Sequence, residues 1–186
     1  MRLTDVAQHW LAEIIQEGDV VVDATLGNGF DALFLAQKIG EAGVLFAFDV
    51  QTQAIKTSQA LLADEPCQQY LLLTGHETMK ANIPQYFHGH IKVIMFNLGW
   101  LPNSDKSVIT QTKTTIQALA QSLEFLATNG RLSVMVYPGH AGGDYEAKQV
   151  MNWLEQTCEN NKYFIYKAII LPNRPTAPIL LQVTKL

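Results

Sequence analysis

The stretch VVVDATLGNGFDALFLA, residues 20–36, decides the fold of this chain. Three valines lead to Asp23, a glycine turn follows at residues 27–29, and an apolar pattern at helical spacing begins after the turn. A strand, a glycine turn and a helix in this order present backbone N–H groups and a helix N-terminus to a nucleotide-like ligand. Glycines suit such a turn because they adopt positive φ and have no Cβ to hold a ligand away from the backbone.

The charges around this turn discriminate between two ligands. Residues 27–32 satisfy the dinucleotide pattern G-x-G-x-x-G/A, and Asp49 follows at about the 20-residue distance expected of a ribose-binding acid. However, Asp23 and Asp31 flank the turn with no Lys or Arg between them. At an effective dielectric of about 20, each like-charge pair near 5 Å costs roughly 3 kcal/mol, which disfavours a pyrophosphate. S-adenosylmethionine (SAM) carries an ammonium and a sulfonium but no phosphate, so the acids favour SAM over the alternative, NAD.

Length and composition are those of a globular protein without membrane segments. The 186 residues are most simply one domain, residues 1–186, with 13 basic and 17 acidic side chains and a formal net charge of −4. No apolar run approaches the roughly 20 residues of a membrane span, and the N-terminus lacks the layout of a signal peptide. Cys67 and Cys158 have neither metal nor redox spacing, so we expect a cytoplasmic protein with no metal site.

Strand and helix patterns alternate along the chain. Apolar strands are expected at residues 20–23, 44–49, 69–74, 91–97, 132–137, 163–171 and 179–184. Helices are expected at 3–17, after the glycine turn up to Gly40, at 51–63, from a cap at Thr110 to Asn129, and at 144–158. This alternation predicts a doubly wound, seven-stranded, mostly parallel sheet with an antiparallel C-terminal hairpin. Such a sheet suits a methyltransferase better than a dehydrogenase.

Polar residues stand where the expected strands end, which is where open α/β sheets bind ligands. Asp49 could accept hydrogen bonds from two ribose hydroxyls. His76 and Glu77 follow the third strand and could line the adenine or ribose side of a donor, but they could equally start a helix. Tyr137 to His140 follow the fifth strand; His140 could take a proton or be an ordinary surface histidine.

The exit of the fourth strand, FNLGWLP at residues 96–102, has the composition of an acceptor site. The carboxamide oxygen of Asn97 can accept a hydrogen bond from an N–H donor, as methylation of a neutral amine requires. Gly99 allows a close approach to the backbone, and Trp100 offers a face for stacking a base or shielding a cation. A structural turn with a buried Trp is the alternative interpretation.

These segments together resemble a small bacterial family of rRNA methylase-like proteins. Its better-defined members are tRNA 5-aminomethyl-2-thiouridine methyltransferases of the MnmM type. The resemblance covers nearly the whole chain and rests on DATLGNGFDALFLA (23–36), FDVQTQAIKT (48–57), GHE (75–77), FNLGWLPNSDK (96–106), VYPGHAGG (136–143) and NRPTAP (173–178). Trp100 stands where the family usually has Tyr, and Asn103 and Ser104 stand where it has two glycines.

The resemblance implies a class I, Rossmann-like methyltransferase that uses SAM to methylate the exocyclic amine of a wobble uridine, within the anticodon stem-loop of tRNA. We assign catalysis to Asn97, Trp100 and His140. Donor binding is assigned to Asp23, Thr25, Gly27, Asn28, Gly29, Asp31, Asp49, Gln51, His76, Glu77 and Asn97. Substrate binding is assigned to Leu98, Gly99, Lys106, Tyr137, Gly139, Asn173 and Arg174.

The acidic net charge keeps other functions open, because phosphate contacts need clustered Lys and Arg. A tRNA enzyme would have to gather its basic residues near the site or across a homodimer; the candidates are Lys80, Lys106, Lys113, Lys167 and Arg174. A methyltransferase acting on another RNA or on a free small-molecule amine is one alternative. A non-catalytic module that binds the donor or a nucleotide is another.

Overall fold

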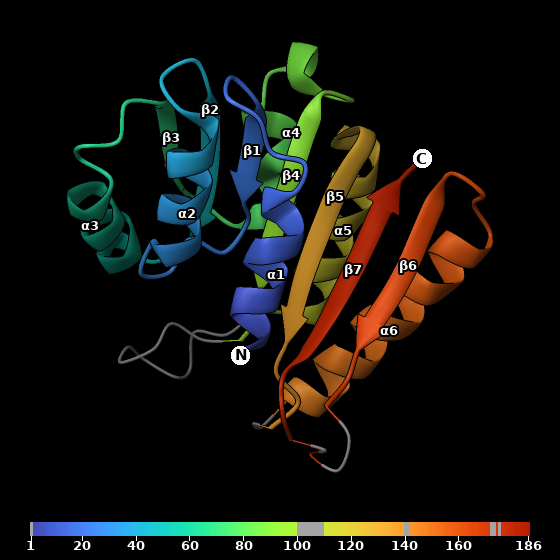
Figure 1. Ribbon diagram of the computed structural model, residues 1–186. Helices are drawn as coiled ribbons and strands as arrows, with labels where there is room; N and C mark the ends of the chain where they lie inside the picture. The colour runs from blue at the N-terminus through green and yellow to red at the C-terminus, as the bar shows by residue number, and fades with distance from the viewer. Residues whose placement is uncertain (1, 100–109, 140–141, 172–173, 175) are drawn as a thin grey trace.

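A computed structural model describes the chain except for residues 1, 100–109, 140–141, 172–173 and 175. Its strands form a seven-stranded sheet in the order β3-β2-β1-β4-β5-β7-β6 (Figure 1). The strands are β1 (Val20–Asp23), β2 (Val44–Asp49), β3 (Gln68–Leu73), β4 (Ile91–Asn97), β5 (Leu126–Val136), β6 (Phe164–Ile169) and β7 (Ile179–Lys185). β7 pairs antiparallel with both β5 and β6, and the other pairings are parallel. The predicted doubly wound class I sheet is confirmed.

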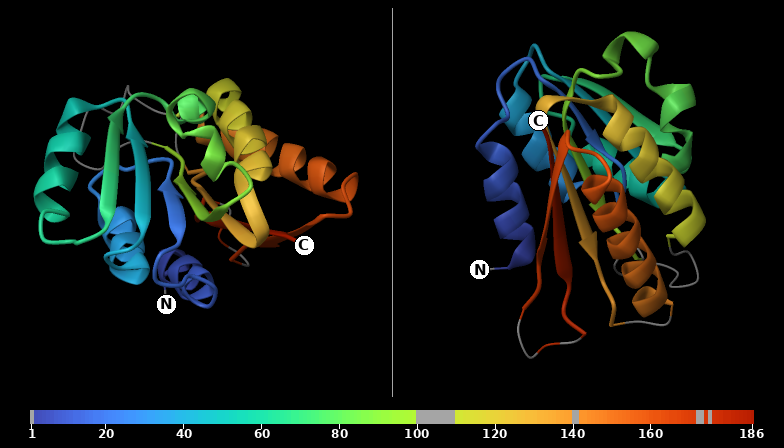
Figure 2. Two further views of the ribbon diagram at one scale, coloured as in Figure 1. Left: turned by 90° about the horizontal axis from the view of Figure 1, so that it is seen from above. Right: turned by 90° about the vertical axis from the view of Figure 1, so that its right-hand side faces the viewer.

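Helices cover both faces of the sheet, as Figure 2 shows from two sides. One face carries α1 (Leu3–Ala12), α2 (Phe30–Ile39) and α3 (Thr52–Leu61), whose apolar side chains pack on those of β1, β2 and β4. The other carries α4 (Met79–Asn82), α5 (Thr112–Phe125) and α6 (Gly143–Glu159) over a larger core that includes Phe46, Phe96 and Phe125. Short 3₁₀ turns, η1 (His76–Thr78) and η2 (Gln85–Phe87), flank α4. Burial on both faces explains why the central strands read as continuous apolar runs rather than as alternating ones.

The strand order places the candidate residues at one edge of the sheet. The chain reverses its winding direction between β1 and β4, which lie side by side and parallel. Asp23, the last residue of β1, pairs with Met95, so β4 runs on for two residues to Asn97. Ligands of open α/β sheets bind beyond the carboxyl ends of the strands at such a reversal.

Predicted boundaries of α1, α5 and β5 are wrong. Helix α1 ends at Ala12 rather than residue 17, and a turn leads from it to Gly18. Helix α5 has Gln111 rather than Thr110 at its N-cap position and ends at Phe125, so β5 begins at Leu126, well before the predicted start at residue 132.

The early start of β5 has a local cause. Asn129 takes a positive φ of 61° inside the strand, where the pairing of β4 with β5 shifts register. An Asn–Gly pair usually marks a turn, but here it forms an irregularity inside a strand. Lys185 Nζ of β7 bonds to the junction of α5 and β5, because it donates to Leu126 O at 2.6 Å and to Leu123 O at 3.5 Å.

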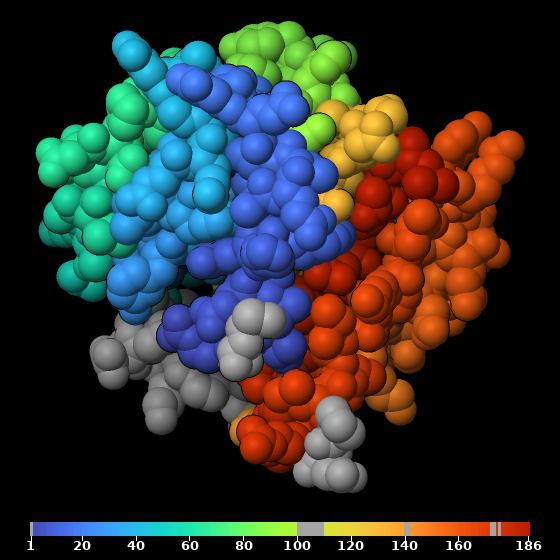
Figure 3. Space-filling model, viewed as in Figure 1, coloured from blue at the N-terminus to red at the C-terminus, as the bar shows by residue number. Residues whose placement is uncertain are grey.

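The N-terminal segment belongs to the body of the fold. Figure 3 shows it, in dark blue, between the α2 region and the red and orange C-terminal strands. Leu3, Ala7 and Leu11 of α1 are buried, and Arg131 of β5 donates to Trp10 O and to Glu13. In the described part of the chain, no helix is both long and apolar enough to cross a bilayer.

Candidate active site

The glycine turn between β1 and α2 depends on an inter-helix contact as well as on backbone conformation. Gly27 and Gly29 have φ of 52° and 83°, in the left-handed region that favours glycine. A Cβ on Gly29 would lie 2.7 Å from Ser58 Oγ of α3, which itself donates to Gly27 O at 3.2 Å. The absence of a side chain at Gly29 therefore lets α3 support the turn, in addition to the ligand access expected from the sequence.

Asp49, at the end of β2, is held by backbone N–H groups on both carboxylate oxygens. Its Oδ2 accepts from Gly27 N at 2.9 Å and its Oδ1 from Gln51 N at 2.8 Å. Each oxygen keeps a further lone pair for a hydroxyl group. The carboxylate thus links the glycine turn to the start of α3 and is oriented before any ligand arrives.

Asp23, at the end of β1, has an unsatisfied oxygen. The residue is 1% exposed, its Oδ1 accepts from Thr25 N at 3.1 Å, and its Oδ2 has no hydrogen-bond partner among the described residues. Burial, reinforced by the nearby Asp31 and Asp49 carboxylates, raises the pKa of Asp23 to about 8. A buried acceptor of this kind fits a cationic group, since a cation would relieve both the missing hydrogen bond and the repulsion. We use the name acidic turn for Asp23, residues 27–29 and Asp49.

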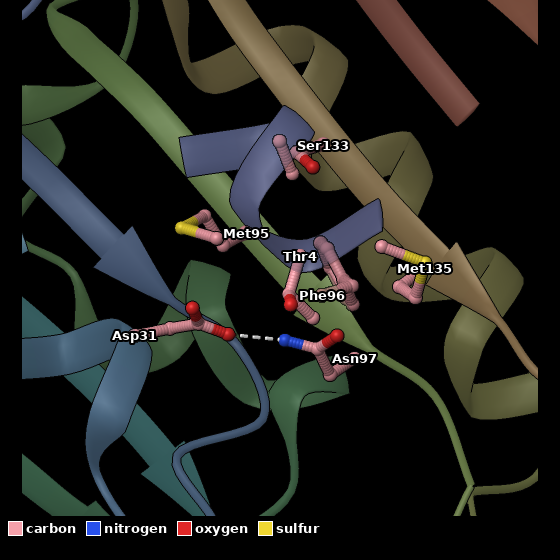
Figure 4. A pocket seen from close by; sticks show the side chains of 8 residues that line it. Thr4, Asp31, Met95, Phe96, Asn97, Ser133 and Met135 are labelled. Atoms are coloured by element: carbon pink, nitrogen blue, oxygen red, sulfur yellow. Dashed lines mark hydrogen bonds between the residues drawn. The ribbon is translucent and has the colours of Figure 1, made fainter. Parts of the chain in front are cut away.

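A second group of polar side chains gathers beside the acidic turn. The Asn97 amide donates from Nδ2 to Asp31 Oδ2 (Figure 4), and Gln8 Nε2 of α1 donates to Asp31 Oδ1 at 2.7 Å. Tyr137 OH lies 3.4 Å from Asn97 Oδ1 and donates to it. We use the name amide cluster for Gln8, Asp31, Asn97 and Tyr137, which come from α1, α2, β4 and the end of β5. The cluster orients the Asn97 amide with its oxygen away from Asp31.

Burial sets the electrostatics of the amide cluster. It raises the pKa of the Asp31 carboxyl, while the hydrogen bonds from Gln8 and Asn97 act in the opposite direction. Burial and the Asp31 carboxylate raise the pKa of the Tyr137 phenol, so Tyr137 is a neutral donor at physiological pH. The backbone of Asn97 is fixed as well, because its N–H donates to Thr25 Oγ1 at 2.6 Å. The hydroxyl of Thr25 therefore ties the glycine turn to the exit of β4.

His76 lies beneath the acidic turn. The ring is 7% exposed and packs edge-on against Phe96, and Nδ1 lies 3.2 Å from Ala24 O. A carbonyl only accepts, so Nδ1 carries the proton and Nε2 is a buried acceptor that has no partner in the described part of the chain. Burial lowers the pKa of His76, which keeps the ring neutral. Glu77 lies in the 3₁₀ turn η1, where Gln117 and Gln121 donate to its carbonyl.

The remaining predicted residues divide into three groups. Leu98 is buried in the core and its N–H donates to Met135 O. Gly139 packs so close to Thr176 O that a Cβ would lie 2.8 Å from it. Arg174 is exposed, and Asn28 is half-buried. The predictions for Trp100, Lys106, His140 and Asn173 fall outside the described residues.

Sequence reasoning missed the residues that hold the site from a distance. Gln8 was not predicted to belong to the site. It follows Thr4 by one helical turn and lies next to the buried stripe of Leu3, Ala7 and Leu11. Polar residues in this position indicate a polar edge beside the buried face of the helix. Thr110 and Glu146 were also missed. Thr110 Oγ1 accepts from Gly99 N at 2.9 Å and donates to the buried Glu146 at 2.6 Å, which fixes the start of the loop after β4 to α6. The described residues contain no group of three or more His, Cys, Asp or Glu side chains suited to a metal.

Comparison with known sequences identifies the family. The family described as "Putative rRNA methylase" matches residues 45–184. The chain is also 33% identical to the chloroplastic tRNA (mnm5s2U34)-methyltransferase of Arabidopsis thaliana, over 99% of this chain and 69% of that protein.

Solved structures agree with this relationship. A structure described as a putative rRNA methylase from Clostridium thermocellum matches with a TM-score of 0.93 and 35% identity, covering 100% of this chain and 98% of that one. A methyltransferase from Streptococcus mutans in complex with S-adenosylhomocysteine (SAH) matches with a TM-score of 0.86 and 31% identity, covering 100% and 99%. The orphaned Asp23 oxygen and the oriented Asp49 carboxylate fit the ammonium and ribose of the corresponding donor. The chain belongs to the rRNA methylase family and is a SAM-dependent methyltransferase.

Proposed function

We propose that this enzyme methylates the amino nitrogen of the 5-aminomethyl group on wobble uridine 34 of tRNA, giving the methylaminomethyl nucleoside. The observation that carries the proposal is the orientation of the Asn97 amide. Asp31 takes the Nδ2 end, so the Oδ1 end is the acceptor left at the carboxyl end of β4, next to the acidic turn. An amine needs such an acceptor to hold its lone pair in line with a methyl group. The identity with the Arabidopsis enzyme supports the choice of substrate.

Within this proposal the residues have distinct tasks. Asp23 holds the ammonium of SAM and Asp49 its ribose, and bound SAM supplies an activated methyl group. The neutral amine nitrogen forms the new N–C bond as the methyl–sulfur bond breaks, and the methylammonium product then loses one proton to solvent. Asn97 and the aromatic ring of Trp100 orient the aminomethyl-uridine. Orientation is most of the catalysis required, because the sulfonium is already a good leaving group.

The protonation state of the substrate limits the reaction. A primary amine is largely protonated at neutral pH, and the carboxylates of Asp23, Asp31 and Asp49 favour the ammonium form. The raised pKa of Asp23 reduces that negative charge. We expect the rate of methyl transfer to rise with pH as the fraction of neutral amine increases.

Recognition of tRNA requires basic residues, and in this chain the 13 basic residues are outnumbered by 17 acidic ones, which gives a net charge of −4. Lys113 in the first turn of α5 and Arg174 are exposed near the carboxyl edge, whereas Lys80 is paired with Glu124 at 3.0 Å. Anticodon-loop bases are unstacked easily, so contacts to one splayed base supply much of the specificity. A homodimer would add the basic residues of a second copy. The reduced, buried Cys67 and Cys158 are consistent with a cytoplasmic enzyme.

The net charge favours one competing function, methylation of a free small-molecule amine, which needs no basic surface. Salt separates the two functions. Binding of tRNA through several phosphates weakens steeply as salt is raised, whereas binding of a small amine barely changes.

The direct test uses purified protein, SAM and tRNA prepared from cells that lack this gene. Nucleosides are digested after reaction and identified by mass spectrometry. The proposal predicts that 5-aminomethyl-2-thiouridine gains one methyl group and that rRNA from the same cells gains none. Methylation of rRNA alone, or of no nucleoside, would overturn it.

A further inference from the structure

We propose that Gln8, on the N-terminal helix α1, is a positioning residue for methyl transfer: it holds the Asp31 carboxylate, and Asp31 in turn determines which end of the Asn97 amide meets the acceptor amine. This inference rests on the proposed role of Asn97. Gln8 lies outside every segment that the sequence assigned to the site, and 89 residues separate it from Asn97 in the chain.

The geometry forms a relay through one carboxylate. Gln8 Nε2 donates to Asp31 Oδ1 at 2.7 Å, and Asn97 Nδ2 donates to Asp31 Oδ2. Asp31 is only partly exposed in the first turn of α2, so water competes little for its oxygens. Two amide groups from different elements thus share one carboxylate, and each fixes the position of the other.

An ionised carboxylate gives this relay its direction. It can only accept hydrogen bonds, so it selects the Nδ2 end of Asn97 and leaves Oδ1 for an incoming N–H. A protonated Asp31 could instead donate to Oδ1, and the amide could then turn over and present its NH₂ group to the amine. Gln8 opposes that outcome because a hydrogen bond to the charged form stabilises it.

The surroundings of Asp31 make the contribution of Gln8 necessary. Burial favours the neutral acid, and within the described residues the titratable groups that interact with Asp31 are Asp23 from β1 and Tyr137 after β5. An ionised Asp23 would repel the Asp31 carboxylate, and the Tyr137 hydroxyl donates to Asn97 Oδ1 rather than to Asp31. The amides of Gln8 and Asn97 are the donors that offset burial, and Gln8 is the one that does not contact the substrate.

Helix α1 is docked firmly enough for this task. Leu3, Ala7 and Leu11 are buried against the sheet, and Thr4 and Ala7 line a narrow pocket together with Asp31 and Asn97 (Figure 4). Gln8 therefore approaches Asp31 from a packed helix rather than from a loose N-terminal segment.

The test compares Gln8→Met, which keeps the length of the side chain but removes the donor, with His9→Met at the exposed neighbouring position on the same helix. Single-turnover methyl transfer, SAM affinity and the melting temperature are measured for both, with Asn97→Ala as a reference. We expect Gln8→Met to slow methyl transfer about tenfold, which is less than the roughly 100-fold cost of a misplacement of 1 Å because Gln8 acts through Asp31. SAM affinity and melting temperature should match those of His9→Met, and Gln8→His, which retains an N–H donor, should recover most of the rate.

A second readout does not depend on the acceptor. Carbon-13 NMR follows the titration of the Asp31 carboxyl, and its midpoint should move to higher pH in Gln8→Met but not in His9→Met. An unchanged midpoint, or an unchanged rate when Asn97→Ala is slow, would overturn the role of Gln8 and leave the proposed function intact. A parent enzyme that fails to methylate aminomethyl-uridine would instead overturn the proposed function, while the shift of the Asp31 midpoint would still support its coupling to Gln8.

Discussion

The acidic turn and the amide cluster lie side by side at one sheet edge, yet they are built differently. In the acidic turn, carboxylates accept from backbone N–H groups: Asp23 from Thr25, and Asp49 from Gln51 and Gly27. In the amide cluster, side chains hold other side chains across sequence separations of 23, 40 and 66 residues. The first arrangement is fixed once two βα turns have folded. The second exists only after α1, α2, β4 and β5 have packed together.

This difference separates binding from chemistry. Backbone N–H groups hold the acidic turn in one geometry. A SAM-binding site needs such a fixed geometry, because it must be formed before the substrate arrives. Side-chain contacts let the amide cluster fix the direction of one functional group, the Asn97 amide. The proposed methylation requires this direction, because the amide oxygen must face the substrate amine. Variants in the acidic turn should therefore change mainly donor affinity, and variants in the amide cluster mainly the rate of transfer.

The largest effect should come from Asn97→Ala. Removing the acceptor should slow single-turnover methyl transfer roughly 100-fold or more, as loss of a positioned hydrogen bond in a transition state does. SAM affinity, measured by calorimetry, should stay within a few-fold of the parent. Asn160→Ala, at the far end of α6, is the matched control. A variant that turned over normally would make the exit of β4 a structural turn and remove the contrast between the two regions.

Asp49→Ala should have the converse effect. SAM binding should weaken by about 1.5–3 kcal/mol, the range for hydrogen bonds to a charged group. The rate at saturating SAM should change much less. Calorimetry gives the affinity, and Asp49→Asn, which keeps one carbonyl acceptor, should retain part of it. Unchanged affinity in Asp49→Ala would contradict the assignment of the ribose.

Asp23 should make stability depend on pH. Its pKa is about 8 in the folded protein and near 3.8 when unfolded, so between pH 4 and 8 the folded state binds the extra proton. Stability of the free protein should therefore fall as pH rises through this window, by at most about 1.4 kcal/mol per pH unit. Urea unfolding at pH 5, 6.5 and 8 measures the slope, and Asp23→Asn should reduce it. An Asp23→Asn variant with the slope of the parent would show that Asp23 is not the buried acid responsible.

The smallest of these effects concerns Gly29. Gly29→Ala should lower the free energy of unfolding by about 1–2 kcal/mol, through a positive φ and a clash with Ser58 Oγ. Adding Ser58→Gly removes the clash but not the backbone strain, so the double variant should recover only part of the loss. Full recovery would mean that helix packing alone requires glycine at this position.

The same division explains what the sequence could predict. The sheet, its antiparallel end and the acidic turn were predicted from local patterns, because each apolar run, glycine turn and terminal acid is recognisable from the residues next to it in the chain. The start of β5 could not be predicted in this way. Asn129 and Gly130 are residues typical of a turn, but pairing with β4 keeps them in a strand. Gln8 could not be predicted either, because nothing local to α1 indicates that a carboxylate from α2 will meet it.

The side chains at the exit of β4 show the same limit. The sequence indicated that Asn97 accepts a hydrogen bond, but not which end of the amide would face outward. That direction depends on Asp31, which from the sequence was expected only to bind the donor. Similarly, Thr110 was predicted to cap a helix, whereas the packing of α6 places Glu146 within reach of its hydroxyl.

The most direct test of the substrate is the nucleoside profile of tRNA from cells that lack this gene, complemented with either the parent or Asn97→Ala. Mass spectrometry of digested tRNA should show loss of methylaminomethyl-uridine and accumulation of its aminomethyl precursor. The parent gene should restore the profile, and Asn97→Ala should restore little of it. An unchanged nucleoside profile in the deletion strain would contradict the proposal that this methyltransferase acts on the wobble uridine.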